Sequence, residues 1–201
     1  MKPAACCIAA AVAVLCGCGA GRQEALSLGK VLTENRQEFS GGSATENDLV
    51  AATRGWAEGI VANGAGQGAQ LEQNVAAADD LAKSAGLVSL QLGQLRKAVY
   101  DLSLQKEFTQ GLRSALITEI TRRQRTLQDL RSALTDSAGQ LRLMGQTRAY
   151  KGESYPAAID RLAQMTQGYK PPKDTVGDML TTLKNEFGIK DVELVRQAAA
   201  R

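Results

Sequence analysis

The 201-residue sequence predicts an all-α protein, an elongated helical bundle with coiled-coil character. Ala, Leu, Gln, Arg and Glu dominate the composition, and these residue types favour helices. No proline occurs between Pro3 and Pro156. Apolar residues recur at alternating steps of three and four along the middle of the chain, which is the spacing of a heptad seam. We therefore expect a long heptad-patterned helix or a helical hairpin over about residues 67–147, with shorter helices on both sides.

The chain begins with a short basic segment and an apolar run. Lys2 is followed by residues 4–15, which carry no charge and have the length of the apolar core of a secretory signal peptide. The run is too short to span a bilayer, which takes about 20 apolar residues. It ends in Leu15-Cys16-Gly17-Cys18. This segment resembles the lipobox of bacterial lipoproteins, in which a leucine, a variable residue and a Gly or Ala precede the acceptor cysteine.

The resemblance covers only residues 1–18, and it names a processing class. It implies that residues 1–17 are a signal peptide, that Cys18 receives a diacylglyceryl group, and that the new terminus is N-acylated, for example with palmitate. Two or more acyl chains give stable membrane anchoring, so the resemblance implies a lipid-anchored protein of the cell envelope. Gly19 after the cysteine, where an aspartate implies inner-membrane retention, favours the outer membrane. An ordinary signal peptide is the alternative interpretation.

The composition excludes several classes of chemistry. The chain has no histidine, which removes His-based nucleophile pairs, His-based acid–base catalysis and nearly all zinc sites. The segment Gly64-Ala65-Gly66-Gln67-Gly68 follows a helical stretch and lacks a following Lys-Ser/Thr pair, so it predicts a linker rather than a phosphate loop. After processing, Cys18 is alkylated and no free thiol or disulfide remains. We expect no enzyme activity, no cofactor and no metal.

Charge is distributed unevenly along the sequence. Residues 22–80 hold four basic and nine acidic side chains, residues 81–151 hold twelve basic and five acidic, and residues 152–201 hold seven of each. The favoured interpretation is that acidic N-terminal helices pack along the basic middle segment, so that the charges compensate within the fold. The alternative is a basic surface for anionic lipids or envelope polymers. A formal net charge of +3 argues against nucleic-acid binding.

Capping residues and helix-breaking residues predict the ends of the first two helices. Residues 18–23 are expected to form a lipidated tether, and a first helix is expected from about Glu24 to Phe39, ended by Ser40-Gly41-Gly42-Ser43. Ser43 or Thr45 then caps a second helix that Asn63-Gly64 ends. Glu46 and Asp48 are assigned to its polar surface. Its apolar stripe is Leu49, Trp56 and Ile60.

The middle of the chain carries the heptad seam. Its first part consists of Leu71, Asn74, Ala78, Leu81, Ala85, Val88, Leu92, Leu95, Val99 and Leu102. Polar positions Lys106, Thr109 and Arg113 interrupt it, and it resumes in the same phase at Leu116, Ile120, Arg123, Leu127, Leu130, Leu134, Ser137, Leu141 and Met144. Unbroken phase favours one long helix. The polar gap and Gly111 favour a hairpin turning near Leu104–Gly111, and we lean slightly to the hairpin.

The C-terminal part predicts shorter elements, so residues 24–149 and 150–201 are treated as an elongated helical domain and a small helical segment. Pro156 opens a helix through Gln167, and residues 168–173 form a stiff connector. Asp174 caps a helix that ends at Gly188, and a last helix follows from Lys190. Tyr150, Tyr155 and Tyr169 are expected to seal the packing around this junction.

Four residues are candidates for interaction with a partner. Trp56, flanked by Gly55 and Gly59, is interpreted first as a core residue that a neighbouring helix approaches closely, and second as a partner-facing residue. Arg122, Arg123 and Arg125 form the densest basic cluster, interpreted first as a solvated, salt-bridged helix face. Arg123 lies on the seam itself, where a polar residue can select register or partner.

These observations predict a structural or protein-interaction module in the cell envelope. Its expected partners are the lipid bilayer through Cys18 and a protein partner or second copy through the helical seams. The alternative is a helical bundle that binds a small apolar or amphipathic ligand between its helices, because bundle cores host such sites.

Overall fold

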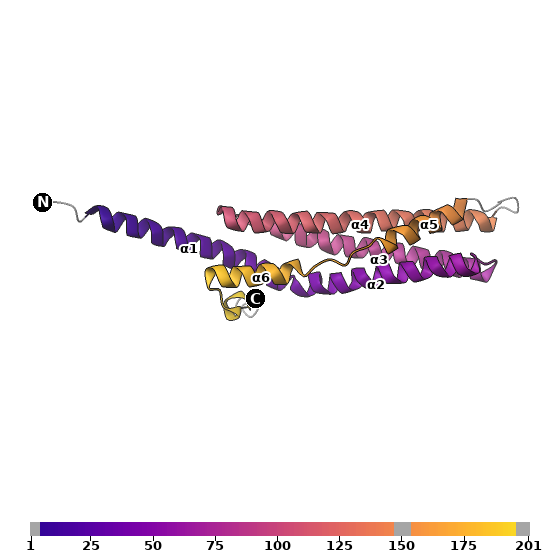
Figure 1. Cartoon of the computed structure of the whole chain (residues 1–201), viewed down its shortest axis with the longest axis horizontal. Coiled ribbons are helices and arrows are strands. Elements are labelled where there is room, and N and C mark those ends of the chain that lie inside the picture. The colour runs from indigo at the N-terminus through magenta and orange to yellow at the C-terminus, as the bar shows by residue number, and fades with distance from the viewer. Residues whose placement is uncertain (1–4, 147–153, 196–201) are drawn as a thin grey trace. The chain divides into compact units, whose positions relative to one another are not determined.

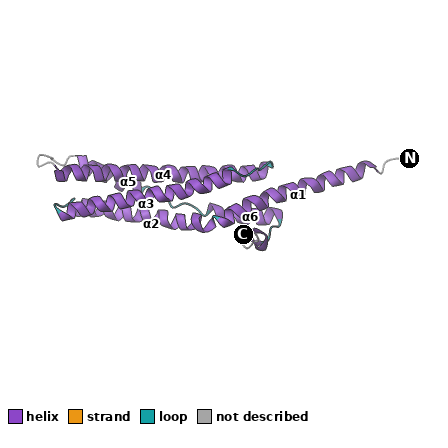
Figure 2. Ribbon diagram, turned by 180° about the vertical axis from the view of Figure 1, so that it is seen from behind, coloured by secondary structure: helices purple, strands orange, loops and turns teal. Residues whose placement is uncertain are grey.

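The computed structural model describes residues 5–146 and 154–195, and within them it contains helices and loops but no strand (Figure 2). The side chains of residues 5–18, 37–44 and 154 lie outside that description. The all-α prediction is confirmed. The described helices are α1 (Ala5–Glu34), α2 (Arg36–Asn63), α3 (Ala69–Tyr100), α4 (Glu107–Gln146), α5 (Ser154–Gln167), α6 (Thr175–Phe187) and α7 (Asp191–Val195).

Contacts between residues divide the chain into two units that do not follow its linear order. Unit 1 comprises Met1–Phe39, Leu95–Glu119 and Asp174–Arg201, and unit 2 comprises Ser40–Gln94 and Ile120–Lys173. The C-terminal segment expected over 150–201 is therefore shared between the two units. Helices α3 and α4 each contribute to both.

Unit 2 is a bundle in which α2, α3, α4 and α5 lie side by side (Figure 1). The Arg54 guanidinium in α2 donates to the backbone oxygen of Thr166 in α5, which fixes α5 along α2. Each helix turns one apolar face inward. The resulting core includes Leu49, Val50, Ala57, Ile60, Ala78, Val88, Leu92, Leu127, Leu130, Leu134, Leu141, Ile159 and Leu162.

The seam forms an antiparallel hairpin, so the single long helix is wrong. Gln124 Nε2 in α4 donates to the Ser89 oxygen in α3 at 3.0 Å within unit 2. Within unit 1, Arg113 Nη1 donates to the Leu102 oxygen at 2.8 Å. Within unit 2, Arg142 lies further along α4 than Gln124 and pairs with Asp79, which lies before Ser89 on α3, so the two arms run antiparallel. Residues 101–106 make the turn, and Gly111 lies inside α4.

Burial confirms the heptad assignment. Most seam positions of α3 and α4 are buried, while the polar interruption at Lys106 is exposed in the turn. Two seam-adjacent glycines of α3 make room for long side chains of α4. A Cβ on Gly86 would lie 3.4 Å from the Arg131 guanidinium, and one on Gly93 would lie 3.1 Å from Gln124 Nε2. The hairpin buries both apolar seams against each other within one chain, and this burial favours the hairpin over a single long helix.

The helix boundaries near residue 40 differ from the expectation. The chain breaks at Asn35, and α2 runs through Ser40-Gly41-Gly42-Ser43. Glycine costs a helix only about 1 kcal/mol per residue relative to alanine. Burial of the apolar face of α2 in unit 2 outweighs this local preference. The helix ends as expected at Gly64, whose amide donates to the Ile60 oxygen at 2.8 Å and whose φ is 76°.

Unit 1 is built around the C-terminal half of α1, which packs on α6 and α7. Leu28 and Leu32 of α1 are fully buried. The approach to α7 is close, because a Cβ on Gly29 would lie 2.8 Å from Leu194. Helix α6 has the expected ends: the Asp174 carboxylate accepts from the Gly177 amide, and Gly188 adopts the left-handed conformation at φ 59°.

Residues 18–23, expected to be a tether, lie within α1, which begins well before Glu24. No helix in the ranges 5–146 and 154–195 combines the length and apolar character needed to cross a membrane.

The side chain of Glu24 caps the start of α4 from outside that helix. Its Oε2 accepts from the Lys106 amide at 2.9 Å and from the Thr109 hydroxyl at 2.7 Å. Desolvation acts to raise the pKa of Glu24, but the hydrogen bonds from Lys106 and Thr109 outweigh it and hold the pKa below its usual value. The contact joins α1 to the α3–α4 turn within unit 1.

Replacing Glu24 by glutamine is expected to reduce the loss of stability under acid conditions. Because the folded pKa lies below the unfolded value of about 4.3, the carboxylate stabilises the fold above that pH, and this contribution is lost as the pH falls through the folded pKa. Thermal unfolding midpoints measured from about pH 7 to about pH 3 test this. Glu24→Gln should be less stable near neutral pH and less acid-sensitive, whereas Glu34→Gln, at an exposed position of α1, should match the unmodified protein.

Candidate functional site

A charged residue occupies the seam of α4 in the interior of unit 2. Arg123 lies between Ile120 and Leu127 on the buried face, and only 1% of the residue is exposed. An arginine keeps its charge at any accessible pH. A buried guanidinium therefore requires an anionic partner and hydrogen bonds, because the cost of removing it from water is several kcal/mol.

The partner is Glu46 of α2. Arg123 Nε donates to Glu46 Oε2 at 2.7 Å, and Nη2 lies 2.7 Å from the same oxygen. The two side chains are 0% and 1% exposed, so the pair is screened from water on all sides. The assignment of Glu46 to a polar surface is wrong. The packing of α2 against the seam of α4 places this carboxylate inside the bundle.

A third side chain completes the cluster from the connector that follows α5. The Tyr169 hydroxyl donates to Glu46 Oε1 at 2.9 Å and lies 3.1 Å from Asn47 Oδ1. Burial raises the pKa of Tyr169, and the adjacent Glu46 charge raises it further. The hydroxyl therefore stays protonated and remains a donor. We call Glu46, Arg123 and Tyr169 the polar clasp.

The polar clasp connects three segments that are distant in sequence: α2, α4 and the connector after α5. Both carboxylate oxygens of Glu46 are already engaged, one by the guanidinium and one by the phenol. Such an arrangement holds segments together, and it leaves no carboxylate oxygen directed toward a substrate. The expectation that acidic and basic segments compensate within the fold is supported by this pair and by the Arg142–Asp79 pair between α4 and α3.

The structure separates the three arginines of the basic cluster. Arg123 belongs to the polar clasp, whereas Arg122 and Arg125 are exposed on α4. The sequence signal for the clasp was a charge on the apolar seam, which requires a buried acidic partner. Which acidic residue pairs with Arg123 depends on how α2 packs against α4. Glu46 has polar neighbours in the sequence, so its pattern predicts a surface position and not burial.

Trp56 lies on α2 and is half-buried, so it is not one of the buried core residues. Its indole Nε1 is buried and has no hydrogen-bond partner within the described residues. The expected close approach of a helix over Gly55 and Gly59 is wrong, since a Cβ on either would meet nothing within 4 Å. These glycines instead border a groove of about 440 Å³ that Trp56 also lines.

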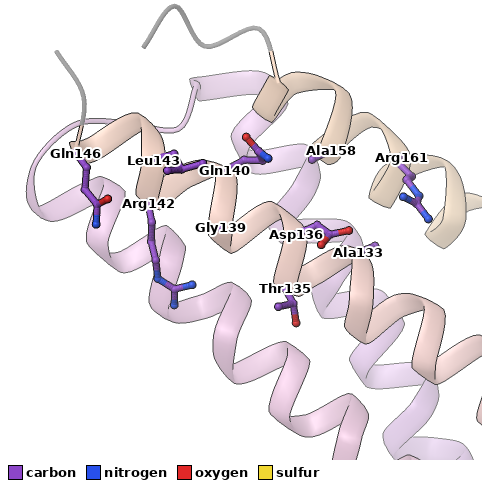
Figure 3. Close-up of a pocket in the computed structure, with 10 residues that line it drawn as sticks. All are labelled: Ala133, Thr135, Asp136, Gly139, Gln140, Arg142, Leu143, Gln146, Ala158 and Arg161. Carbon is purple, nitrogen blue, oxygen red and sulfur yellow. The ribbon is translucent and has the colours of Figure 1, made fainter. Parts of the chain in front are cut away.

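A larger groove of about 620 Å³ runs along α4 beside α5. Its charged lining residues are Asp136, Arg142 and Arg161 (Figure 3). Asp136 and Arg142 point to different sides of α4, and Arg142 is engaged with Asp79 of α3. The two charged groups that α4 contributes therefore do not converge on one point where a ligand could be held.

Cys18, the predicted lipidation residue, lies on α1, and its side chain is outside the described residues. Tyr150 also falls outside them. No protein-family model, no curated protein and no solved structure matches this chain.

Breaking the buried ion pair from one side is expected to be strongly destabilising. Arg123→Met leaves the Glu46 charge buried without its cation and should cost about 3–5 kcal/mol in urea unfolding. The double variant Arg123→Met/Glu46→Leu removes both charges and should recover most of that loss. Arg125→Met, an exposed neighbour, is the matched control and should change stability by less than about 0.5 kcal/mol. If Arg123→Met and Arg125→Met changed the free energy of unfolding equally, the Arg123–Glu46 pair would not contribute to stability as proposed.

The hydroxyl of Tyr169 is expected to contribute measurably by itself. Tyr169→Phe removes a hydrogen bond to a buried charge and should cost about 1.5–3 kcal/mol. Tyr155→Phe is the matched control, because Tyr155 is half-buried and its hydroxyl has no partner among the described residues. Because the folded pKa of Tyr169 is raised, its contribution is complete below the unfolded pKa of about 10 and declines as the pH rises above it. The difference between Tyr169→Phe and unmodified protein should therefore shrink in strongly alkaline urea titrations.

Proposed function

We propose that this protein is a lipid-anchored component of the bacterial cell envelope whose helical body acts as a structural or protein-interaction module. The observation that carries the proposal is the segment Leu15-Cys16-Gly17-Cys18 directly behind an apolar run with a basic start. The outer membrane is the proposed location, because Gly19 rather than an aspartate follows the acceptor cysteine.

The described body supports a scaffold role. The polar clasp links segments and leaves no free carboxylate oxygen on Glu46, and the charged residues that α4 contributes to the groove beside α5 do not converge. Helix α3 presents Leu87 and Leu90 to solvent, at 63% and 60% exposure. The two leucines are three residues apart and so share a helix face. Exposed apolar side chains on one face favour contact with another protein.

A second candidate function is the binding of a small amphipathic molecule. A groove of about 420 Å³ within unit 2 is lined by apolar residues that include Leu71, Val75 and Leu141, together with the charged Glu72, Asp79 and Arg142. Its volume falls in the range of about 300–1,000 Å³ that is typical of small-molecule sites. This mixture of apolar and charged lining fits an amphipathic ligand better than a purely apolar one.

Cys18→Ala is expected to release the protein from membranes. Removing the acceptor sulfur removes the acyl chains that give stable anchoring. Intact mass of the purified native protein should show a processed chain that begins at Cys18 and carries fatty acids, and membrane fractionation should show the variant in the soluble fraction. Cys16→Ala is the matched control and should leave mature mass and fractionation unchanged. A processed native terminus without fatty acid contradicts the anchor.

The role of the body is tested on the same lipidated protein. Native mass spectrometry from detergent should detect a stoichiometric protein partner or a second copy. A copurifying small molecule without any protein partner would favour the second candidate function instead.

A further inference from the structure

The folded body begins almost at the proposed lipid attachment point. Residues 18–23 lie within α1, so no flexible linker separates Cys18 from unit 1. Gly19 and Ala20 are exposed, but Gly21 is already buried. Cys18 lies three residues before Gly21, which corresponds to about 4.5 Å along a helix axis.

Two phenylalanines of unit 1 lie near Gly21, in the middle of α1. A Cβ on Gly21 would lie 3.5 Å from the Phe187 ring at the end of α6, and 3.9 Å from the Lys106 side chain. Phe187 packs edge-on against Phe108 of α4, with ring centroids 5.6 Å apart and planes at 64°. Phe108 remains 43% exposed, although it belongs to the most apolar residue class. We call Phe108 and Phe187 the aromatic pair.

Charged residues neighbour the aromatic pair along the chain, and both rings stay partly exposed. Lys106 and Glu107 are exposed at the start of α4, and Glu186 is exposed next to Phe187. Lys184 is engaged in an ion pair with Asp191. Partly exposed aromatic rings whose neighbours in the sequence carry charges of both signs are suited to the boundary between lipid headgroups and acyl chains.

Contacts within unit 1 fix the part of α1 that follows Cys18. Arg22 Nη2 donates to both carboxylate oxygens of Glu193, at 2.7 and 3.0 Å. Glu24 binds the start of α4 through the Lys106 amide and the Thr109 hydroxyl. The first turns of α1 after Cys18 are thus held against both neighbouring elements. The attachment point therefore cannot move independently of the aromatic pair.

We propose that the aromatic pair is a second membrane contact, inserted into the bilayer interface beside the acyl chains of Cys18. This inference rests on the proposed lipid anchor. The bilayer is the proposed occupant rather than another protein, because acyl chains attached about one helical turn before Gly21 bring lipid to this surface. Two membrane contacts on one rigid element orient unit 1 on the membrane, whereas a tethered body would rotate freely.

The test uses the lipidated full-length mature protein in vesicles of phosphatidylethanolamine and phosphatidylglycerol. After processing, the chain has no thiol that can react, so an introduced cysteine takes a fluorophore at one position. Gln105→Cys places the probe in the exposed turn beside Lys106, and Glu34→Cys places the control probe at an exposed position at the far end of α1. Nitroxide-labelled lipids then quench probes near the interface. Quenching at position 105 should exceed that at position 34 by at least about twofold, given interfacial depths of about 5–10 Å.

Substitutions on the Gln105→Cys background identify the aromatic pair as the cause. Phe108→Ser should reduce quenching toward the level of position 34, and Phe108→Leu, which keeps an apolar side chain, should retain it. Tyr100→Ser is the matched control, because Tyr100 is an aromatic residue of unit 1 that is 70% exposed. It should leave quenching unchanged.

Three outcomes separate the two proposals. Strong quenching at position 105 that depends on Phe108 supports the second contact. Equal quenching at positions 105 and 34, or quenching insensitive to Phe108→Ser, in protein whose mass proves acylation overturns the second contact and leaves the anchor intact. Protein that carries no fatty acid and does not float with vesicles overturns the anchor, and the second contact with it.

Discussion

The positively charged Arg123 guanidinium is fully buried on the α4 seam and cannot reach water from there. Its position is therefore acceptable only where Glu46 of α2 lies opposite, and Glu46 in turn receives the Tyr169 hydroxyl. A heptad repeat by itself permits several registers, because each step of seven residues presents similar leucines. The buried charge removes that degeneracy, since any other register leaves a cation in an apolar environment. One ion pair thus defines how α2, α4 and the connector after α5 meet in unit 2.

Unit 1 depends on a different physical principle. Its helices are held by close approach at small residues and by a cap supplied from another helix. Gly29 allows Leu194 to contact the α1 backbone, and Glu24 satisfies the amide of Lys106 at the start of α4. Unit 1, which contains Cys18, thus depends on close backbone approach and on the Glu24 carboxylate as well as on its buried leucines.

Most of the fold can be predicted from the periodicity of apolar residues in the sequence. The remaining features depend on the surroundings of individual residues in the folded structure. Helix class, the seam, the caps at Asp174 and Gly188, and the position of Arg123 on a buried face all follow from spacing and residue type. The predicted helix end at residues 40–43 is wrong, because tertiary packing of α2 outweighs the weak local preference of Ser and Gly against a helix. The burial of Glu46 depends on which distant segments of the chain meet, and so does the choice between one long helix and a hairpin. The periodicity of the sequence does not specify these contacts. The lipid anchor rests on the sequence alone.

The antiparallel register of α3 and α4 has a consequence for how such a chain can change length. Within unit 2, the Asp79–Arg142 and Ser89–Gln124 contacts hold the two arms antiparallel to each other. An insertion of seven residues into α3 alone would shift every later pair, whereas equal insertions into both arms would lengthen the hairpin and preserve every existing layer. Homologous chains should therefore vary by paired heptads, added at mirror positions about residues 101–106.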